Sequence, residues 1–341
     1  MIRRRLIAFA VTLFAASAAP LAAETVKPAT APEQCGGRNM IEEMRVTDPP
    51  RYQRVIDGAA KIENGGALLW KIEKDGIAPS YLFGTIHMAD ARVTALNAIT
   101  THALSKAKTV ALEIANMSDQ GMMAAMTKVP DLLAYTDGTT LKAQLSEAEF
   151  AKVQQLITKT GMPGDAAIVL RPWLISTLLA ISDCHRAQME AGKKALDEQV
   201  ESTAKANGAT VVGLETAESQ LAAMASIPND AQIKILKAGL VYADRTDDMI
   251  ETLVQMYLKR NIAATMPFQL ALAEKAGVDP SIYDDFIRIL ITDRNRKMRD
   301  AAQPLLEKGN AFVAVGSLHL PGHTGLVTLL REAGYKVTPA E

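Results

Sequence analysis

Two histidines in this sequence follow the same short pattern at the end of an apolar run. His87 stands three residues after Gly84 in the stretch YLFGTIHMAD. His319 stands three residues after Gly316 in the stretch FVAVGSLHLPG. Because the chain has five histidines in total, the repeated Gly-x-x-His pattern indicates that these two share a task.

Two acidic residues also stand at the ends of apolar runs. Glu113 interrupts TVALEIA (109–115), and Glu215 closes TVVGLE (210–215). A carboxylate in such a run is expensive to bury without a partner. We therefore expect Glu113 to be either a functional group or one half of a structural salt bridge with Arg294 or Arg296.

These residue types suit metal-assisted hydrolysis. Imidazole nitrogens and carboxylate oxygens bind Zn²⁺, Mn²⁺, Co²⁺ or Fe²⁺, and such an ion makes bound water a nucleophile near neutral pH. A free carboxylate then serves as general base. Since ligands in open α/β sheets bind beyond the carboxyl ends of strands, neighbouring strands would bring the four side chains together. The alternative for each histidine is a hydrogen-bonded structural role.

Two further residues are candidates at this site. Arg294 is expected to bind a substrate carboxylate or an oxyanion, or to pair with Glu113. Tyr257, in VQMYLKRN, is expected to donate a hydrogen bond to the site, with a place in the core as the alternative. Asp197, in ALDEQV, is expected to cap a helix or brace the sheet.

Strands at both ends of the chain must position these residues. ALLWKIEKDG and SYLFGTIH are separated by turn residues and predict a hairpin, and YKVT near the end predicts an edge strand. Continuous apolar runs, TVVGLE included, indicate buried strands covered on both faces. The sequence thus predicts an α/β fold, with α+β as the alternative: a central mixed sheet built from N- and C-terminal strands.

The middle of the chain is predicted to be a large helical insertion over residues 118–208 and 216–308. Ser146 and Glu149 form a capping box at one helix start. Residues 93–106 and 187–206 are each predicted to form one continuous helix, the second stopped by Asn207-Gly208.

Composition and the first residues point to an exported globular protein. The 341 residues are 48% hydrophobic and 22% charged, and the lack of a basic stripe argues against a nucleic-acid partner. Residues 1–23 have the basic, apolar and small-residue order of a secretory signal. Cleavage is predicted after Ala23, with Ala22 as the alternative. The apolar part is short for a membrane span, although an uncleaved anchor is the second interpretation.

The two cysteines, Cys35 and Cys184, would meet an oxidising compartment after export. The sequence therefore predicts one disulfide between them and a periplasmic location. The alternatives are two buried thiols, or a metal site formed by Cys184 and His185.

The order of the motifs resembles that of the TraB/PrgY/GumN family, to which the Tiki metalloproteases also belong. FGTIH, ALE, ALDEQV, VVGLET with a following Q, RN..M and AVGSLHLPG occur in the family's order between about residues 65 and 338. The resemblance assigns the paired motifs to Gly84–His87 and Gly316–His319 and the family's acid to Glu113. Its later motifs fall on three more residues: Glu215, Arg294 and Asn295.

The resemblance implies a single domain over residues 65–341, preceded by an extended or helical segment (24–64), with a core like that of erythromycin esterases and ChaN-like proteins. It implies a divalent-metal-dependent hydrolase, first of all a peptidase, using Mn²⁺, Co²⁺ or Zn²⁺. With the residue chemistry above, the predicted metal ligands are His87, His319, Glu113 and Glu215, and the predicted catalytic groups are Glu113 and Arg294. Arg294, Asn295 and Tyr257 are predicted to lie toward the substrate.

We expect the chain to lack the membrane anchor of the Tiki proteins, so their substrate is not carried over. The expected partner is a peptide or small-molecule substrate, with no nucleic acid and no stable membrane insertion after signal cleavage. The alternative function is a periplasmic binding protein that holds haem, a small molecule or a signalling peptide without turnover.

Overall fold

The computed structural model describes residues 34–115 and 119–341. The predicted secretory signal lies outside the described residues, as do residues 24–33 of the predicted extended segment.

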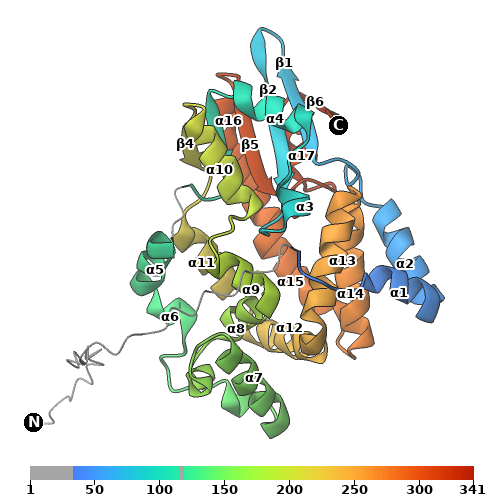
Figure 1. Cartoon of the computed structure of the whole chain (residues 1–341), viewed down its shortest axis with the longest axis vertical. Coiled ribbons are helices and arrows are strands. Elements are labelled where there is room, and N and C mark those ends of the chain that lie inside the picture. Colours follow the sequence, from blue (N-terminus) through green and yellow to red (C-terminus); the bar gives the residue numbers. More distant parts are fainter. Residues whose placement is uncertain (1–33, 116–118) are drawn as a thin grey trace, which may run out of the picture. The chain divides into compact units, whose positions relative to one another are not determined.

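A six-stranded mixed sheet lies at the centre of the fold, in the order β4-β3-β5-β2-β1-β6 (Figure 1). The strands are β1 (Leu69–Lys74), β2 (Ile77–Thr85), β3 (Thr109–Leu112), β4 (Thr210–Gly213), β5 (Ala311–Gly316) and β6 (Lys336–Pro339). Strands β2, β5, β3 and β4 run parallel to one another, and β1 is antiparallel to both β2 and β6. The predicted α/β fold and its mixed sheet are confirmed.

The predicted hairpin and edge strand are also present. In the hairpin β1–β2, Leu69 faces Phe83, and Gly76 supplies the positive φ of 75° that its tight turn needs. The last strand, β6, pairs with β1 at one edge of the sheet.

The other regular elements of the described chain are helices, and its α-helices are as follows. Before β1 they are α1 (Met40–Thr47) and α2 (Pro49–Ala60), and between β2 and β3 they are α3 (Ala91–Thr94) and α4 (Ala98–Lys106). Between β3 and β4 they are α5 (Asp119–Lys128), α6 (Pro130–Leu133), α7 (Glu147–Lys159), α8 (Pro172–Leu179), α9 (Asp183–Glu190) and α10 (Leu196–Ala206). Between β4 and β5 they are α11 (Ala217–Ala225), α12 (Asn229–Val241), α13 (Thr246–Leu258), α14 (Thr265–Lys275), α15 (Tyr283–Ile287) and α16 (Asp293–Leu306). Helix α17 (Leu326–Glu332) precedes the last strand. The predicted helical middle is therefore confirmed.

Side chains of β5 alternate between two apolar layers. Phe312 packs in the layer that holds Leu104 of α4 and Val200 of α10. Val313 packs in the opposite layer, with Met298 of α16. Helices thus cover both faces of the sheet, which explains why the central strands are continuous apolar runs.

Three predictions about individual elements are wrong. The helix predicted over 93–106 is two helices, because Asn97 accepts a hydrogen bond from the Thr100 N–H and caps a new start at α4. The helix predicted over 187–206 is also divided. Helix α9 ends before Gly192, which has a positive φ of 78°, and α10 begins after Ala195.

The third correction concerns TVVGLE. Its strand, β4, spans Thr210–Gly213 and has one neighbour, at the edge of the sheet. Val211 and Val212 are half-buried, and Thr210 and Gly213 are exposed. An edge strand between covering helices has the same apolar sequence as a central one, so the pattern did not distinguish them.

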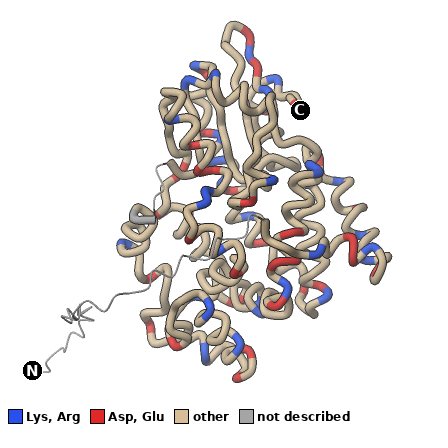
Figure 2. The backbone as a smooth tube through the Cα atoms, in the orientation of Figure 1, with Lys and Arg blue, Asp and Glu red and all other residues tan. Residues whose placement is uncertain are grey.

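Charged residues of both signs are interspersed along the helices (Figure 2). Among the described residues, no helix combines the length and apolarity that crossing a membrane requires.

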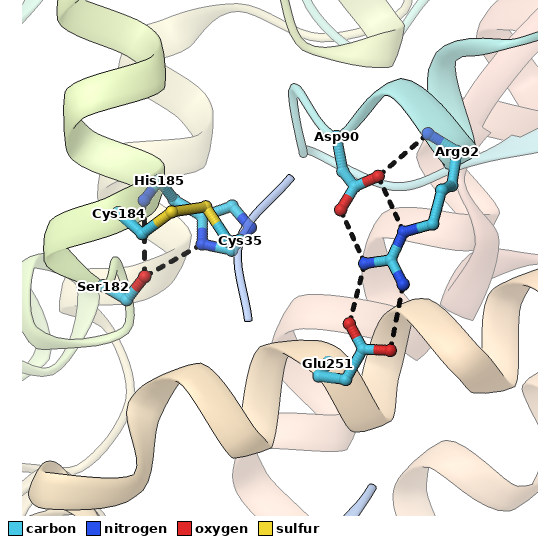
Figure 3. Close-up of a disulfide and its surroundings, with 7 residues drawn as sticks. All are labelled: Cys35, Asp90, Arg92, Ser182, Cys184, His185 and Glu251. Carbon is cyan, nitrogen blue, oxygen red and sulfur yellow. Dashed lines mark hydrogen bonds and ion pairs between the residues drawn. A yellow bond between two sulfur atoms is a disulfide. The ribbon is translucent and has the colours of Figure 1, made fainter. Parts of the chain in front are cut away.

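The predicted disulfide is present between Cys35 and Cys184 (Figure 3). It joins the segment before α1 to α9, across 149 residues of sequence. The alternative metal site of Cys184 and His185 is wrong, because Cys184 is in the disulfide. The His185 Nδ1 lies 2.9 Å from the Ser182 hydroxyl instead.

An ion-pair network next to the disulfide fixes the loop that follows β2 (Figure 3). The Arg92 guanidinium lies 2.7 Å from both Asp90 and Glu251. Asp90 also caps α3 by accepting from the Arg92 N–H. The loop between His87 and α3 is therefore held against α13.

Candidate functional site

Four of the candidate residues lie at the carboxyl ends of four adjacent parallel strands. His87 follows β2, His319 follows β5, Glu113 follows β3 and Glu215 follows β4. Because parallel neighbours end at the same edge of a sheet, the structure brings these residues to one place.

Glu113 lies at the centre of this place and is buried. Its Oε1 accepts from the Gly316 N–H at 2.6 Å, and its Oε2 accepts from the Arg294 Nη2 at 2.6 Å and from the Gln220 amide at 3.0 Å. The His319 Nε2 lies 3.7 Å from Glu113 Oε1. The carboxylate thus has a backbone donor, two side-chain donors and an imidazole around it.

Gly316 leaves open the space that both imidazoles border. A Cβ at this position would lie 3.1 Å from Glu113 Oε1, 3.6 Å from His87 Nε2 and 3.6 Å from His319 Cδ2. The His87 Nε2 and the His319 Cδ2 are therefore separated by at most twice 3.6 Å. A side chain here would fill the space between the imidazoles and the carboxylate, which accounts for the second motif's glycine.

Gly84, the glycine of the first motif, has a packing role. A Cβ here would stand 2.9 Å from Leu320 Cδ2 and 3.1 Å from Ser317 Cα. The carbonyl of Gly84 accepts from the Tyr257 hydroxyl at 2.8 Å. Gly84 thus allows β2 to lie against the turn that carries His319.

Both imidazoles are anchored through Nδ1. The His87 Nδ1 is 2.7 Å from Asp197 Oδ2, and the His319 Nδ1 is 2.7 Å from Asn295 Oδ1. The Asn295 amide nitrogen donates to the Thr324 carbonyl, which directs its oxygen at His319. Since both partners are acceptors, Nδ1 carries a proton in each ring, and Nε2 presents its lone pair to the site when the ring is neutral, as in histidines that bind metals.

Arg294 joins two carboxylates. Besides Glu113, it donates from Nη2 to Glu215 at 2.7 Å and from Nε at 3.0 Å. The guanidinium is buried. The salt bridge considered for Glu113 is therefore present, and its partner is Arg294 rather than Arg296, which is exposed and pairs with Asp293.

The two histidines differ in their electrostatics. The negative charge of Asp197 raises the pKa of His87 above its usual value, although solvent screens this attraction because the side chain is 67% exposed. Burial lowers the pKa of His319. For Glu113, burial acts upward, but the charges of His319, His87 and Arg294 outweigh it and lower the pKa.

The donor types at this place suit a divalent ion, but the fit is partial. Two anchored imidazoles and a carboxylate border one space, which is the chemistry that Zn²⁺, Mn²⁺ and Co²⁺ prefer. Within residues 34–115 and 119–341, however, no group of three or more His, Cys, Asp or Glu side chains could hold a metal ion. Glu113 is already bound by Arg294 and the Gly316 N–H.

Two residues expected near a substrate have partners within the protein. Tyr257 is buried and supports β2 through Gly84, and Asn295 is buried and orients His319. Whether either also contacts a substrate stays a prediction.

Two residues that the motif analysis did not place at the site contribute directly to it. Asp197 lies in the first turn of α10 and accepts from the hydroxyl of Thr85 in β2, so it braces the sheet as expected. It also orients His87. Gln220 donates to Glu113. Its signal in the sequence was the glutamine that follows VVGLET.

Sequence comparisons with known proteins place the chain in a family. Residues 68–339 match the sequence model of the TraB/PrgY/gumN family. The chain is 24% identical over 255 residues to the uncharacterized protein YbaP of Shigella flexneri, which spans 74% of this chain and 88% of the relative. It is 25% identical over 194 residues to the uncharacterized protein YbaP of Escherichia coli strain K12, spanning 56% and 68%. No solved structure matches the chain, so the likeness to the erythromycin esterase and ChaN-like core stays a prediction.

Proposed function

The chain belongs to the TraB/PrgY/gumN family, and on this premise we propose that it is an exported, divalent-metal-dependent hydrolase that acts first of all on peptides. The observation that carries the proposal is the pair of imidazoles that face Glu113 across the open space at Gly316. Each ring is anchored through Nδ1 by a side-chain oxygen. That anchoring orients Nε2 before any ligand arrives.

In this proposal His87 and His319 would hold the ion, which would be Mn²⁺, Co²⁺ or Zn²⁺. When bound, the ion supplies a water molecule that ionises near neutral pH. Glu113 is the carboxylate beside it and either completes the metal site or accepts the proton of the water. The charges that lower its pKa keep it ionised at neutral pH, which favours the role of metal ligand, because a lowered pKa weakens a carboxylate as a base.

Arg294 and Glu215 support this carboxylate. The Arg294 guanidinium contacts both Glu113 and Glu215 through Nη2, so it holds Glu113 in place and compensates two negative charges. Glu215 thus contacts Arg294 rather than the reacting groups themselves, and it orients the Arg294 guanidinium.

A second candidate function rests on a different observation. Because Glu113 is already bound by Arg294 and by the Gly316 N–H, the same site is also suited to hold haem, a small molecule or a signalling peptide without turnover. The polar groups around Glu113 would then bind the ligand rather than activate water.

Elemental analysis after dialysis against Mn²⁺, Co²⁺ or Zn²⁺ separates the two candidates. The wild type is compared with the His87→Ala/His319→Ala double variant and with a control that loses two exposed histidines, His102→Ala/His323→Ala. The hydrolase requires about one ion per chain in wild type and control, no ion in the double variant, and metal-dependent cleavage of a peptide library. Equal, negligible metal in all three proteins would favour the binding protein instead, and haem and peptide titrations would identify its ligand.

A further inference from the structure

We propose that an extended peptide docks as an added strand along the outer edge of β4 and enters the site at that strand's carboxyl end. This inference rests on the proposed function, because it names how the peptide is held. Its first support is the strand order, in which β4 has β3 on one side and no strand of the described sheet on the other.

The hydrogen bonds of β4 show which of its backbone groups face outward. The Thr210 N–H donates to the Lys108 carbonyl at 2.9 Å, and the Leu214 N–H donates to the Leu112 carbonyl at 2.8 Å. Successive residues of a strand direct their backbone groups to opposite sides. Val211 therefore directs its N–H and C=O away from β3, which is the pattern that an added strand recognises.

A pocket of about 390 Å³ lies against this edge. Val211, Val212 and Gly213 of β4 line it, as does Ala125 of α5. Side chains around it are mostly small or apolar, which allows another main chain to approach β4 closely. Together with the outward backbone groups, this lining suits an extended peptide better than a compact charged ligand.

The pocket adjoins the candidate site. Glu215, which also lines it, shares Arg294 with Glu113. Ile114 and Ala115, which line it as well, directly follow Glu113 in the chain. A peptide laid along β4 would therefore extend toward Glu113 at the strand's carboxyl end. Because the edge of β4 leads toward the candidate site, the proposed occupant is a substrate peptide.

Val211→Pro tests the docking directly. Proline removes the outward N–H of Val211 but leaves the bonds from Thr210 and Leu214 to β3, and edge strands accept proline. Val211→Ala is the matched control, since it also loses the valine side chain and keeps the N–H. Both changes are made in the His87→Ala/His319→Ala background, so that binding is measured without cleavage.

The probe is a nine-residue blocked peptide of alternating valine and serine with a lysine at each end. Fluorescence anisotropy measures its binding. We expect Val211→Pro to weaken its binding about three- to tenfold, the range for one lost hydrogen bond, and Val211→Ala to change it less than twofold. A second series keeps Val211 and methylates single amides of the peptide. Binding should fall at alternate positions, because alternate amides of an added strand face β4.

The methylated series keeps the test decisive if Val211→Pro does not fold. Binding of the probe that is unaffected by Val211→Pro and by every methylation would overturn the docking, even if the wild type cleaves peptides. Absence of binding at millimolar peptide would also overturn it. An alternating pattern without cleavage in the wild type would support the docking and count against the hydrolase. If Val211→Pro instead abolished dimers of the protein, the occupant would be a second copy of this chain, and the proposal would be wrong.

Discussion

The Arg294 guanidinium lies directly against the Glu113 carboxylate, with 2.6 Å between Nη2 and Oε2, and both side chains are buried. The same nitrogen lies 2.7 Å from Glu215. One cation thus compensates two carboxylates at the sheet edge, and this relationship makes the site sensitive to any loss of Arg294.

Replacing Arg294 with methionine should lower the free energy of unfolding by about 3–5 kcal/mol, because it leaves buried carboxylates without their partner. Urea denaturation at neutral pH measures the change. Arg296→Met is the control, since that side chain is 59% exposed and its loss should change stability by about 0.5 kcal/mol or less. Equal stability of the two variants would show that the buried pair contributes nothing.

Replacing Asp197 with asparagine should disturb the orientation of His87, because the acceptor for Nδ1 loses its charge. If His87 holds an ion as proposed, metal affinity should fall about 10- to 100-fold. Isothermal titration measures the affinity, and ¹⁵N NMR of the His87 ring reports whether the proton stays on Nδ1. Asp300→Asn, at a side chain that is 64% exposed, should leave both readouts unchanged. An unaltered ring spectrum in Asp197→Asn would rule out the positioning role.

His185 should make the folded protein less stable in acid. Burial lowers its pKa, outweighing the opposite effects of Asp247 and Asp90. The folded state therefore keeps His185 neutral, whereas the unfolded chain takes up a proton below its ordinary value of 6.5. Stability is then fully present above that pH and falls as the pH drops below it, by at most about 1.4 kcal/mol per pH unit until the folded pKa is reached.

His185→Asn removes this titration. The variant should lose less stability than the wild type between pH 7 and pH 5, as measured by urea denaturation at both values. His102→Asn, at an exposed histidine, should keep the wild-type dependence. Identical losses in His185→Asn and the wild type would show that other groups control the acid response.

Removing the disulfide should destabilise the fold, because Cys35 and Cys184 close a long loop. We expect Cys35→Ser/Cys184→Ser to lower the free energy of unfolding by about 2–5 kcal/mol. Dithiothreitol should produce a similar loss in the wild type and none in the double variant. A wild type that is insensitive to dithiothreitol at full reduction, confirmed by thiol counting, would contradict this.

The strand ends were predictable from the sequence because apolar runs followed by Gly-x-x-His are local patterns. The contacts that orient the rings were not, because they join distant parts of the chain. Asp197 reaches His87 across 110 residues, and Gln220 reaches Glu113 across 107. Spacing along the chain carries no information on such pairs, which depend on where α10 and α11 pack.

The strand order also had to come from the structure. Strand β5, near the end of the chain, lies between β2 and β3. This insertion is what places His319 next to both His87 and Glu113. The apolar runs predicted that each segment was a strand but not which strands were neighbours. Because TVVGLE resembles the other runs, it was predicted to be a buried strand, although β4 lies at the edge.

The residues of the site are divided between a ring closed by the disulfide and the chain that follows this ring. With the bond between Cys35 and Cys184 closed, the chain between them is a ring that carries His87 and Glu113. The chain after Cys184 is an open tail that carries Glu215, Arg294 and His319. A single proteolytic cut within the ring would release no fragment until the disulfide was reduced. A cut in the tail before β5 would leave only non-covalent packing to hold His319 against the ring.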